Sequence, residues 1–299
     1  MGARLYLEPE LNQPDMLVGW PGIGNIGLIT MDTLRQELGA ELLGEIEPWD
    51  FFYPTKVRIR NGVLDSMEFP ANRFYYKRLA HKDLLFFIGE EQPSGRGGPY
   101  AEGNRAYEMA NLVLNVAEKF GSRRVYTSGA AVALTHHALK PRVWAVATTE
   151  RLLAEVKSQA NTIPMSQVEG RGGQGNITGL NGLLIGVAKK RGLEGICLMG
   201  EIPDYLSRVP FPYPKASQSV VEVLSGILRV SVDLSVLQDL ASQMEEVIEN
   251  MYRQFPAEIR ERLEQRRQVP QPGSAITEED EKWIKEHIDE FFKKGDRGV

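Results

Sequence analysis

"GWPGIGNIG", residues Gly19 to Gly27, lies between an apolar run and a segment with helical spacing. The run Met16-Leu17-Val18 precedes it, and LITMDTLRQELG follows it. This order predicts a strand, a tight glycine-rich turn and a helix, which together make the first part of a βα unit. Because the turn places backbone N–H groups at a helix N-terminus, it also suits an anion or a carboxylate.

The same stretch contains the pattern G-x-G-x-x-G, formed by Gly22, Gly24 and Gly27. After a strand and before a helix, this pattern is typical of a loop that binds the pyrophosphate of a dinucleotide. Glu45 and Glu47 close the next apolar run, where an acid for a ribose hydroxyl would stand. The alternative is structural, because glycines also permit a sharp turn and close packing of a helix on a sheet.

Apolar runs of strand length alternate with stretches of helical period along most of the chain, which is typical of βα units. We expect strands near 16–20, 42–46, 84–88, 124–128, 142–148 and 195–199, and helices near 25–38, 103–120, 179–191 and 216–228. Asn61-Gly62 lies between β-type residues and predicts an antiparallel hairpin that interrupts this alternation. The fold class is therefore α/β, with a mixed sheet covered on both faces by helices.

Near Leu234 the pattern changes to that of an amphipathic helix. Its apolar residues form one stripe at helical spacing: Leu234, Leu237, Leu240, Met244, Val247, Ile248 and Met251. We predict an α/β core over 1–232 and a C-terminal helical extension over 233–299, with a linker near 268–276. The stripe needs a partner, which is either the core of the same chain or another subunit.

The composition excludes several classes of protein and site. A formal charge of −5 argues against a general nucleic-acid binder. No apolar run is long enough to span a membrane and the N-terminus lacks a signal-peptide pattern, so we expect a cytoplasmic protein without a membrane partner. The single Cys197 excludes an internal disulfide and a multi-cysteine metal site, and we expect it to pack in the core. We expect no metal and no obligatory cofactor.

Several apolar runs are followed by Gly, then Glu and soon Pro. These endings are LLGEIEP at 42–48, FFIGEEQP at 86–93 and CLMGEIP at 197–203. If the strands are parallel, their carboxyl ends meet at the edge that carries the glycine turn. The acids of these endings would then face one crevice: Glu45, Glu90, Glu91 and Glu201. Acids that lie together can equally be helix caps or solvated loop residues.

A pocket at this edge would suit a small anion or a nucleoside-like molecule. The candidate ligand-binding residues are Gly22, Gly24, Asn25, Glu90, Gln92, Ser128, Gly129, Asn176, Asn181 and Glu201. No catalytic residue is identified, because Ser128 lacks the G-x-S-x-G context of a nucleophile. His136 and His137 are adjacent and would not share a helix face, so they do not predict a metal pair.

Five segments, in this order, resemble the proteasome assembly chaperone family, in particular bacterial and archaeal relatives of its second subunit. They are GWPGIGNIGLI, GEEQP, SGAA, GNITGLNGLLIG and CLMGEIPDYL with the later YPKAS, and the resemblance covers residues 15 to 230. It implies a three-layer α/β/α sandwich of phosphorylase or hydrolase-like topology with a mostly parallel sheet. It also implies self-association and a protein partner rather than an established enzymatic activity.

Members of that family that assist proteasome assembly are similar in ending with a hydrophobic residue, a tyrosine and one last residue, which dock on the proteasome α-ring. This sequence ends in KKGDRGV, so we do not expect proteasome docking through such a signal.

The first hypothesis for function is therefore a homo-oligomeric, assembly-chaperone-like or protein-interaction protein. The alternative is a small-molecule-binding protein or an enzyme that acts on an anionic or nucleoside-like ligand. A dinucleotide-dependent oxidoreductase is a further alternative, since Gly22, Gly24 and Gly27 satisfy the fingerprint.

Overall fold

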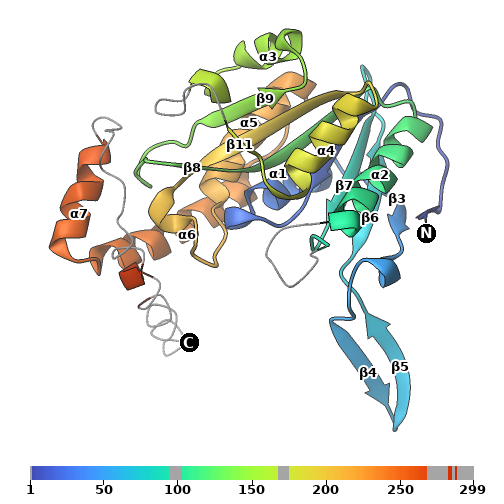
Figure 1. Cartoon of the computed structure of the whole chain (residues 1–299), viewed down its shortest axis with the longest axis horizontal. Helices are drawn as coiled ribbons and strands as arrows, with labels where there is room; N and C mark the ends of the chain where they lie inside the picture. The colour runs from blue at the N-terminus through green and yellow to red at the C-terminus, as the bar shows by residue number, and fades with distance from the viewer. Residues whose placement is uncertain (1, 94–102, 168–174, 268–281, 285–286, 288–299) are drawn as a thin grey trace.

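The computed structural model describes residues 2–93, 103–167, 175–267, 282–284 and 287. Figure 1 shows one large twisted sheet with helices on both faces, and a two-stranded hairpin that projects from the body. Within the described residues the main sheet has the strand order β1-β3-β6-β7-β2-β8-β11-β9-β10. The predicted mixed α/β sandwich is confirmed.

The centre of the sheet is parallel. Its strands are β7 (Leu84–Gly89), β2 (Asp15–Gly19), β8 (Arg124–Ala133) and β11 (Glu194–Pro203). Along β2, Leu17 joins the core on one face of the sheet, while Met16 and Val18 join the core on the other. All three side chains are fully buried, because helices cover both faces of a parallel centre. Cys197 packs in the core on β11, as expected, and burial raises the pKa of its thiol to about 11.

Antiparallel pairs flank this centre. The flanking strands are β1 (Ala3–Leu5), β3 (Glu41–Ile46), β6 (Asn72–Lys77), β9 (Val143–Ala147) and β10 (Thr162–Pro164). Since β6 is antiparallel to both β3 and β7, β3 runs in the direction of β7. β9 runs antiparallel to β11, so its carboxyl end lies at the opposite edge. β1, β6 and β10 were not predicted, because β1 and β10 are only three residues long and NRFYYK mixes charged and aromatic residues.

The helices form two layers. One face carries α1 (Ile26–Glu37), α3 (Glu150–Lys157), α5 (Pro214–Leu228) and α6 (Ser235–Arg253), and the other carries α2 (Gly103–Lys119) and α4 (Gly179–Lys190). The buried residues of α2, such as Ala106, Met109, Ala110 and Val113, repeat at intervals of three and four, which produces one apolar face. The predicted helices 25–38, 103–120, 179–191 and 216–228 are confirmed, and α3 was missed.

The glycine turn is a short 3-10 turn, η1 (Ile23–Asn25), that leads into α1. Gly24 and Asn25 both have positive φ, 59° and 49°, which reverses the chain within two residues. Gly27 permits close packing instead: a Cβ at this position would lie 2.1 Å from the carbonyl oxygen of Ser128 on β8. The glycines therefore have the structural role considered above. They allow the chain to reverse sharply, and they let α1 begin in contact with the backbone of the sheet.

The predicted hairpin consists of β4 (Lys56–Arg60) and β5 (Val63–Glu68). Asn61 and Gly62 both have positive φ, as a type I′ turn requires. The hairpin forms a separate two-stranded sheet, and the antiparallel strand that enters the main sheet is β6 instead. One side of this ribbon, which we call the hairpin face, carries the exposed side chains of Val57, Ile59, Leu64 and Met67.

The C-terminal helices α6 and α7 (Ala257–Glu264) belong to the same apolar core as α5. The predicted stripe on α6 divides in two. Leu237, Ile248 and Met251 are buried in this core. Leu240 and Val247 remain exposed, and Leu234 and Met244 are partly buried against the core. Val236, which was not part of the predicted stripe, is also exposed, and we call Val236, Leu240 and Val247 the α6 stripe. The predicted linker at 268–276 lies outside the described residues.

We predict that Gly27→Ala destabilises the protein by about 1–3 kcal/mol, because a backbone carbonyl cannot move away from the added Cβ as a flexible side chain can. Urea unfolding measures the change. The matched control is Gly22→Ala, where a Cβ would meet no atom within 4 Å and φ is −170°. The control should stay within about 0.5 kcal/mol of the wild type. Equal stability of the two variants would contradict the close-packing account.

Candidate functional site

A cavity of about 500 Å³ lies at the carboxyl edge of the parallel strands. Three segments line it: 21–25 from the glycine turn, 90–92 after β7, and 207–211 after β11. They are far apart in sequence and meet here because β2, β7 and β11 end at the same edge. This is the position at which open α/β sheets bind ligands.

A smaller cavity of about 90 Å³ adjoins the first, and the two share Gly22, Ile23 and Gln92. Its other lining residues come from the position just after β2, from α1, β8 and β11, and from α4 and the segment before it: Trp20, Gly27, Gly129, Ala130, Asn176, Ile177, Thr178, Asn181 and Met199. The glycine turn and the segment 176–178, which leads into α4, therefore lie on the walls of one continuous site.

Gln92 joins three of these walls. Its Nε2 donates a hydrogen bond to the carbonyl oxygen of Pro21 over 2.6 Å. Its Oε1 accepts a hydrogen bond from the backbone N–H of Leu180 over 3.1 Å, in the first turn of α4. One buried side chain thus connects the glycine turn to a helix N-terminus whose N–H groups have no partner within the helix.

Asn181 makes a corresponding connection to β8. Its Nδ2 donates a hydrogen bond to the carbonyl oxygen of Ser128 over 2.7 Å, and its Oδ1 is buried without a hydrogen-bond partner in the described structure. The Ser128 carbonyl is also the group that Gly27 approaches. Ser128 itself is fully buried, so it lies beneath the site and offers its backbone rather than an accessible hydroxyl.

Glu90 and Glu91 supply negative charge to the larger cavity, and Arg208 supplies positive charge. Glu90 also has a structural contact, because its Oε2 accepts a hydrogen bond from the backbone N–H of Ala71 over 2.7 Å. Arg208 was missed by the sequence analysis. The sequence feature that could have identified it is its position shortly after the end of β11, in the proline-rich segment RVPFPYP.

Most of the predicted ligand-binding residues come together. Gly22, Gly24, Asn25, Glu90, Gln92, Gly129, Asn176 and Asn181 all line one or both cavities. Glu201 lies elsewhere: its carboxylate accepts hydrogen bonds from the backbone N–H and Nε of Arg142, over 3.0 and 2.9 Å, and from Trp144 Nε1 over 2.7 Å. The reason is that β11 continues to Pro203, so Glu201 stands inside the strand, beside β9.

Glu45 also lies away from the cavities. β6 and β7 separate its strand β3 from β2, and Glu45 instead accepts a hydrogen bond from Tyr6, which raises the pKa of the Tyr6 phenol. The acid at the end of the strand next to β2 is Glu90. The acid of a dinucleotide fingerprint therefore does not come from Glu45, which is two strands farther from the glycine turn.

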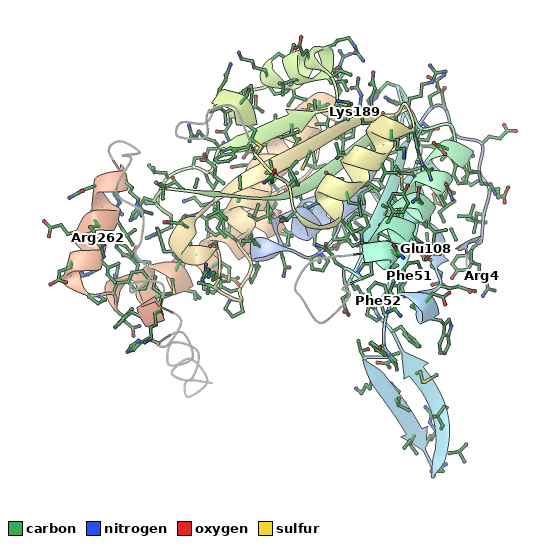
Figure 2. All side chains as sticks on the ribbon, viewed as in Figure 1. Arg4, Phe51, Phe52, Glu108, Lys189 and Arg262 are labelled. Atoms are coloured by element: carbon green, nitrogen blue, oxygen red, sulfur yellow. The ribbon has the colours of Figure 1, made fainter. Side chains whose placement is uncertain are left out.

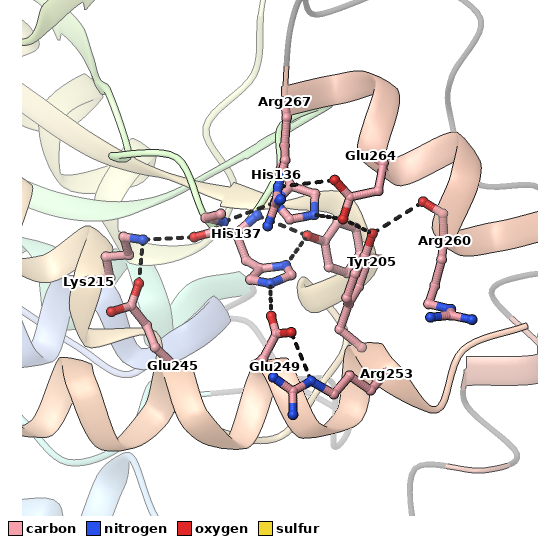
Figure 3. Close-up of polar contacts among 12 residues, drawn as sticks. His136, His137, Tyr205, Lys215, Glu245, Glu249, Arg253, Arg260, Glu264 and Arg267 are labelled. Atoms are coloured by element: carbon pink, nitrogen blue, oxygen red, sulfur yellow. Dashed lines mark hydrogen bonds and ion pairs between the residues drawn. The ribbon is translucent and has the colours of Figure 1, made fainter. Parts of the chain in front are cut away.

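A second polar cluster joins the segment after β8 to the C-terminal helices (Figure 3). His137 accepts a hydrogen bond from the hydroxyl of Tyr205 at Nδ1, over 2.7 Å. Its Nε2 lies 3.2 Å from a carboxylate oxygen of Glu249 on α6 and donates to it in this tautomer. Lys215 of α5 bridges the carbonyl of His137 and the carboxylate of Glu245. These contacts hold α6 against the core.

His136 lies beside this network and is almost fully buried. Burial lowers the pKa of its imidazole to about 3, and the nearby His137 and Arg267 act in the same direction. Burial also lowers the pKa of His137, against the opposing effect of its hydrogen bond to Glu249. Both rings are therefore neutral at neutral pH. In the part of the chain that the structure describes, no group of three or more His, Cys, Asp or Glu side chains is arranged to hold a metal ion.

The architecture and the edge cavities define an α/β/α sandwich protein with a ligand-sized site at its strand ends. The chain belongs to the PAC2 family, whose sequence model matches residues 16–252. The predicted resemblance is thereby confirmed. Among the described helices, none has the length and apolarity needed to cross a membrane.

Relatives of known structure include two proteins of Pyrococcus furiosus. PbaB, described as an archaeal proteasome activator, is 29% identical and superposes with a TM-score of 0.68, covering 83% of this chain and 97% of PbaB. PbaA, described as an archaeal homolog of proteasome-assembly chaperone, is 23% identical with a TM-score of 0.61, covering 90% of this chain and all of PbaA. MJ1210 of Methanocaldococcus jannaschii, described as uncharacterized, is 26% identical over 82% of this chain and 85% of its own length.

We predict that the free energy of unfolding falls as the pH drops from about 6.5 toward 3. The pKa of His136 is lowered on folding, so the unfolded chain binds more protons in this range and acid favours unfolding. Urea unfolding at several pH values between about 7.5 and about 5 measures how steeply the free energy of unfolding changes with pH. His136→Asn keeps an acceptor for the backbone N–H of Ala138 but has no group that titrates in this range. This variant should make the free energy of unfolding less dependent on pH.

His81→Asn removes an imidazole outside the cluster and is the control. A slope that is as steep in His136→Asn as in the wild type would show that another group causes the acid sensitivity.

Proposed function

We propose that this protein is a homo-oligomeric, cytoplasmic protein-interaction factor of the assembly-chaperone type. The observation that carries the proposal is the pair of apolar surfaces that the folded chain leaves exposed, the hairpin face and the α6 stripe. Ile59 and Leu64 are 71% and 60% exposed, and Val236 is 73% exposed. Contiguous exposed apolar side chains on a folded domain are typical of surfaces that bind other proteins.

The similarity to PbaB supports a proteasome-type partner. The two chains align over nearly all of PbaB at 29% identity, and PbaB is described as a proteasome activator. The same three-layer fold occurs in PbaA. For this chain, we propose that binding uses its folded surfaces, because the hairpin face and the α6 stripe expose apolar side chains.

We expect light scattering of the purified chain to give an oligomer mass at micromolar concentration. We also expect the chain to comigrate on native gels with purified 20S proteasome from the source organism or from Pyrococcus furiosus. A monomer at every concentration would contradict self-association. Failure to bind either proteasome would contradict the proteasome-type partner, while leaving self-association in place.

A second candidate function is binding of a small nucleoside-like molecule in the larger cavity. Its volume of about 500 Å³ is within the range of ligand pockets, roughly 300–1,000 Å³. Glu90 ends the strand next to β2, which is where nucleotide-binding folds place the acid that holds a ribose hydroxyl. Two carboxylates beside one guanidinium favour a ligand rich in hydroxyl groups over a strong anion.

A thermal-shift screen with nucleosides, nucleotides, phosphate and amino acids tests this candidate. A ligand at 100 times its dissociation constant stabilises the fold by about 2.7 kcal/mol, which gives a measurable shift. We expect a nucleoside to shift the wild type and to shift Glu91→Gln less. Glu47→Gln, an exposed acid outside both cavities, is the matched control. No shift with any compound would count against the candidate.

A further inference from the structure

We propose that the larger cavity is a regulatory site, in which a bound small molecule holds the C-terminal helices α6 and α7 against the core. This inference rests on the second candidate function above, a nucleoside-like ligand in that cavity. Residues 204–215, which we call the linking segment, connect the two places. The middle of this segment forms a wall of the cavity, and its two ends hold the helices.

The middle of the linking segment belongs to the cavity and to the core at once. Residues 207–211 line the cavity, and two of them, Val209 and Phe211, are buried in the same apolar core as α6 and α7. The backbone N–H of Tyr213 donates a hydrogen bond to the carbonyl oxygen of Gly24 over 2.8 Å, which ties the segment to the glycine turn. The cavity therefore keeps its shape only while the segment stays in this position.

The N-terminal end of the linking segment is held by the C-terminal helices. The carboxylate of Asp204 accepts a hydrogen bond over 2.5 Å from Nη1 of Arg266, which follows α7 and has a fully buried side chain. The next residue, Tyr205, donates to His137, and His137 faces Glu249 of α6 (Figure 3). Separating a buried ion pair leaves an uncompensated charge, so this end moves only together with the turn after α7.

The C-terminal end is held by α6. Nζ of Lys215, in the first turn of α5, donates to the carbonyl oxygen of His137 over 2.8 Å and pairs with the carboxylate of Glu245 on α6 (Figure 3). Only a few residues separate Lys215 from the cavity wall at 207–211. Because this short wall is anchored to the helices at both ends, it cannot keep its position when α6 and α7 move.

The coupling has a definite sign. A ligand in the cavity contacts 207–211 together with the glycine turn, so it gains all of these contacts only while the C-terminal helices are held against the core. A ligand that binds one conformation better shifts the population toward that conformation. Occupancy therefore favours the packed helices and fixes the α6 stripe, which we propose as a partner surface. By linkage, loosening the helices weakens ligand binding by the same factor.

The first test disturbs the linking segment from the cavity side. Gly24→Ala adds a Cβ that would lie 3.0 Å from Cβ of Tyr213, at a position with a φ of 59°. We expect amide hydrogen exchange in α6 and α7 to become faster relative to α2, on the order of 10-fold. α2 is the internal reference because it belongs to the other helix layer, and Figure 2 labels Glu108 on α2 and Arg262 on α7, at opposite ends of the molecule.

Gly27→Ala is the matched control for Gly24→Ala. It strains the same turn, but against the carbonyl of Ser128 on β8 rather than against the linking segment. Its exchange in α6 and α7 should keep the wild-type ratio to α2. If Gly27→Ala accelerates α6 and α7 as much as Gly24→Ala does, the effect is a general loss of stability and the proposal is overturned.

The second test disturbs the segment from the helix side. Lys215→Met removes both contacts of the ammonium group and keeps most of the apolar stem. We expect exchange in the peptide that contains the glycine turn, 21–25, to become faster on the order of 10-fold. The control is Lys140→Met, because the ion pair of Lys140 with Glu222 joins it to α5 rather than to α6. If Lys215→Met or Gly24→Ala changes exchange only at its own end, or at neither, the proposal is overturned.

Adenosine is the probe for the ligand itself. We expect it to slow exchange in α6 and α7 of the wild type, and its dissociation constant to be higher for Lys215→Met on the order of 10-fold. Lys140→Met should bind adenosine as the wild type does. Adenosine binding without slower exchange in α6 and α7 would overturn the regulatory role and leave the second candidate function in place. If neither adenosine nor any other compound of the screen binds, the second candidate function fails and the regulatory role fails with it, whereas exchange in the two variants still decides whether the segment couples the two places.

Discussion

The carbonyl group of Ser128 is the point on which the arrangement at the carboxyl edge depends. The ladder between β2 and β8 ends at Val18 and Thr127, so this carbonyl lies just beyond the pairing with β2. α1 begins against it and leaves no room for a Cβ at Gly27, and Asn181 of α4 donates a hydrogen bond to the same oxygen. The two helix layers are therefore positioned against one peptide group of the central sheet, and the cavities take their shape from that approach.

The C-terminal helices extend the same domain. Ile248, Met251 and Tyr252 bury apolar surface against the core that contains α5, and the polar cluster at His137 orients α6 above it. Tyr205 is buried, so the pKa of its phenol is raised and it acts as a neutral hydroxyl that donates to His137. Since buried polar groups stabilise a structure only when they are satisfied, this network favours one orientation of the helices over others. The outward side of α6 is thereby fixed as well, and with it the exposure of Val236 and Leu240.

The local sequence pattern was sufficient to predict the central strands and the first helix. Helical spacing and apolar runs predicted β2, β7, β8 and α1 within a residue or two of their starts, because in these elements burial follows the local period. Asn61-Gly62 predicted a hairpin turn for the same local reason. Most of the candidate site followed from one further assumption, that the Gly-Glu strand ends share an edge. The position of Glu201 could not be predicted in this way, because the length of β11 and its antiparallel neighbour β9 decide where that side chain points. Arg208 was missed because it belongs to an irregular segment without a periodic signal.

The sequence by itself determined the α/β class, the positions of the strand-to-helix turns and most of the residues that stand at the strand ends, because each depends on spacing and on backbone preferences over a few residues. Only the tertiary structure decided which strand ends adjoin. The order of β3, β6, β7 and β2 takes Glu45 away from the glycine turn and places Glu90 beside it. Strand order is decided by which surfaces bury together across the whole chain, and no short stretch contains that information. The same reason explains why Val236 and Leu240 are exposed while Leu237 is buried: all three are apolar residues of one helix, and the side of α6 that meets α5 separates them.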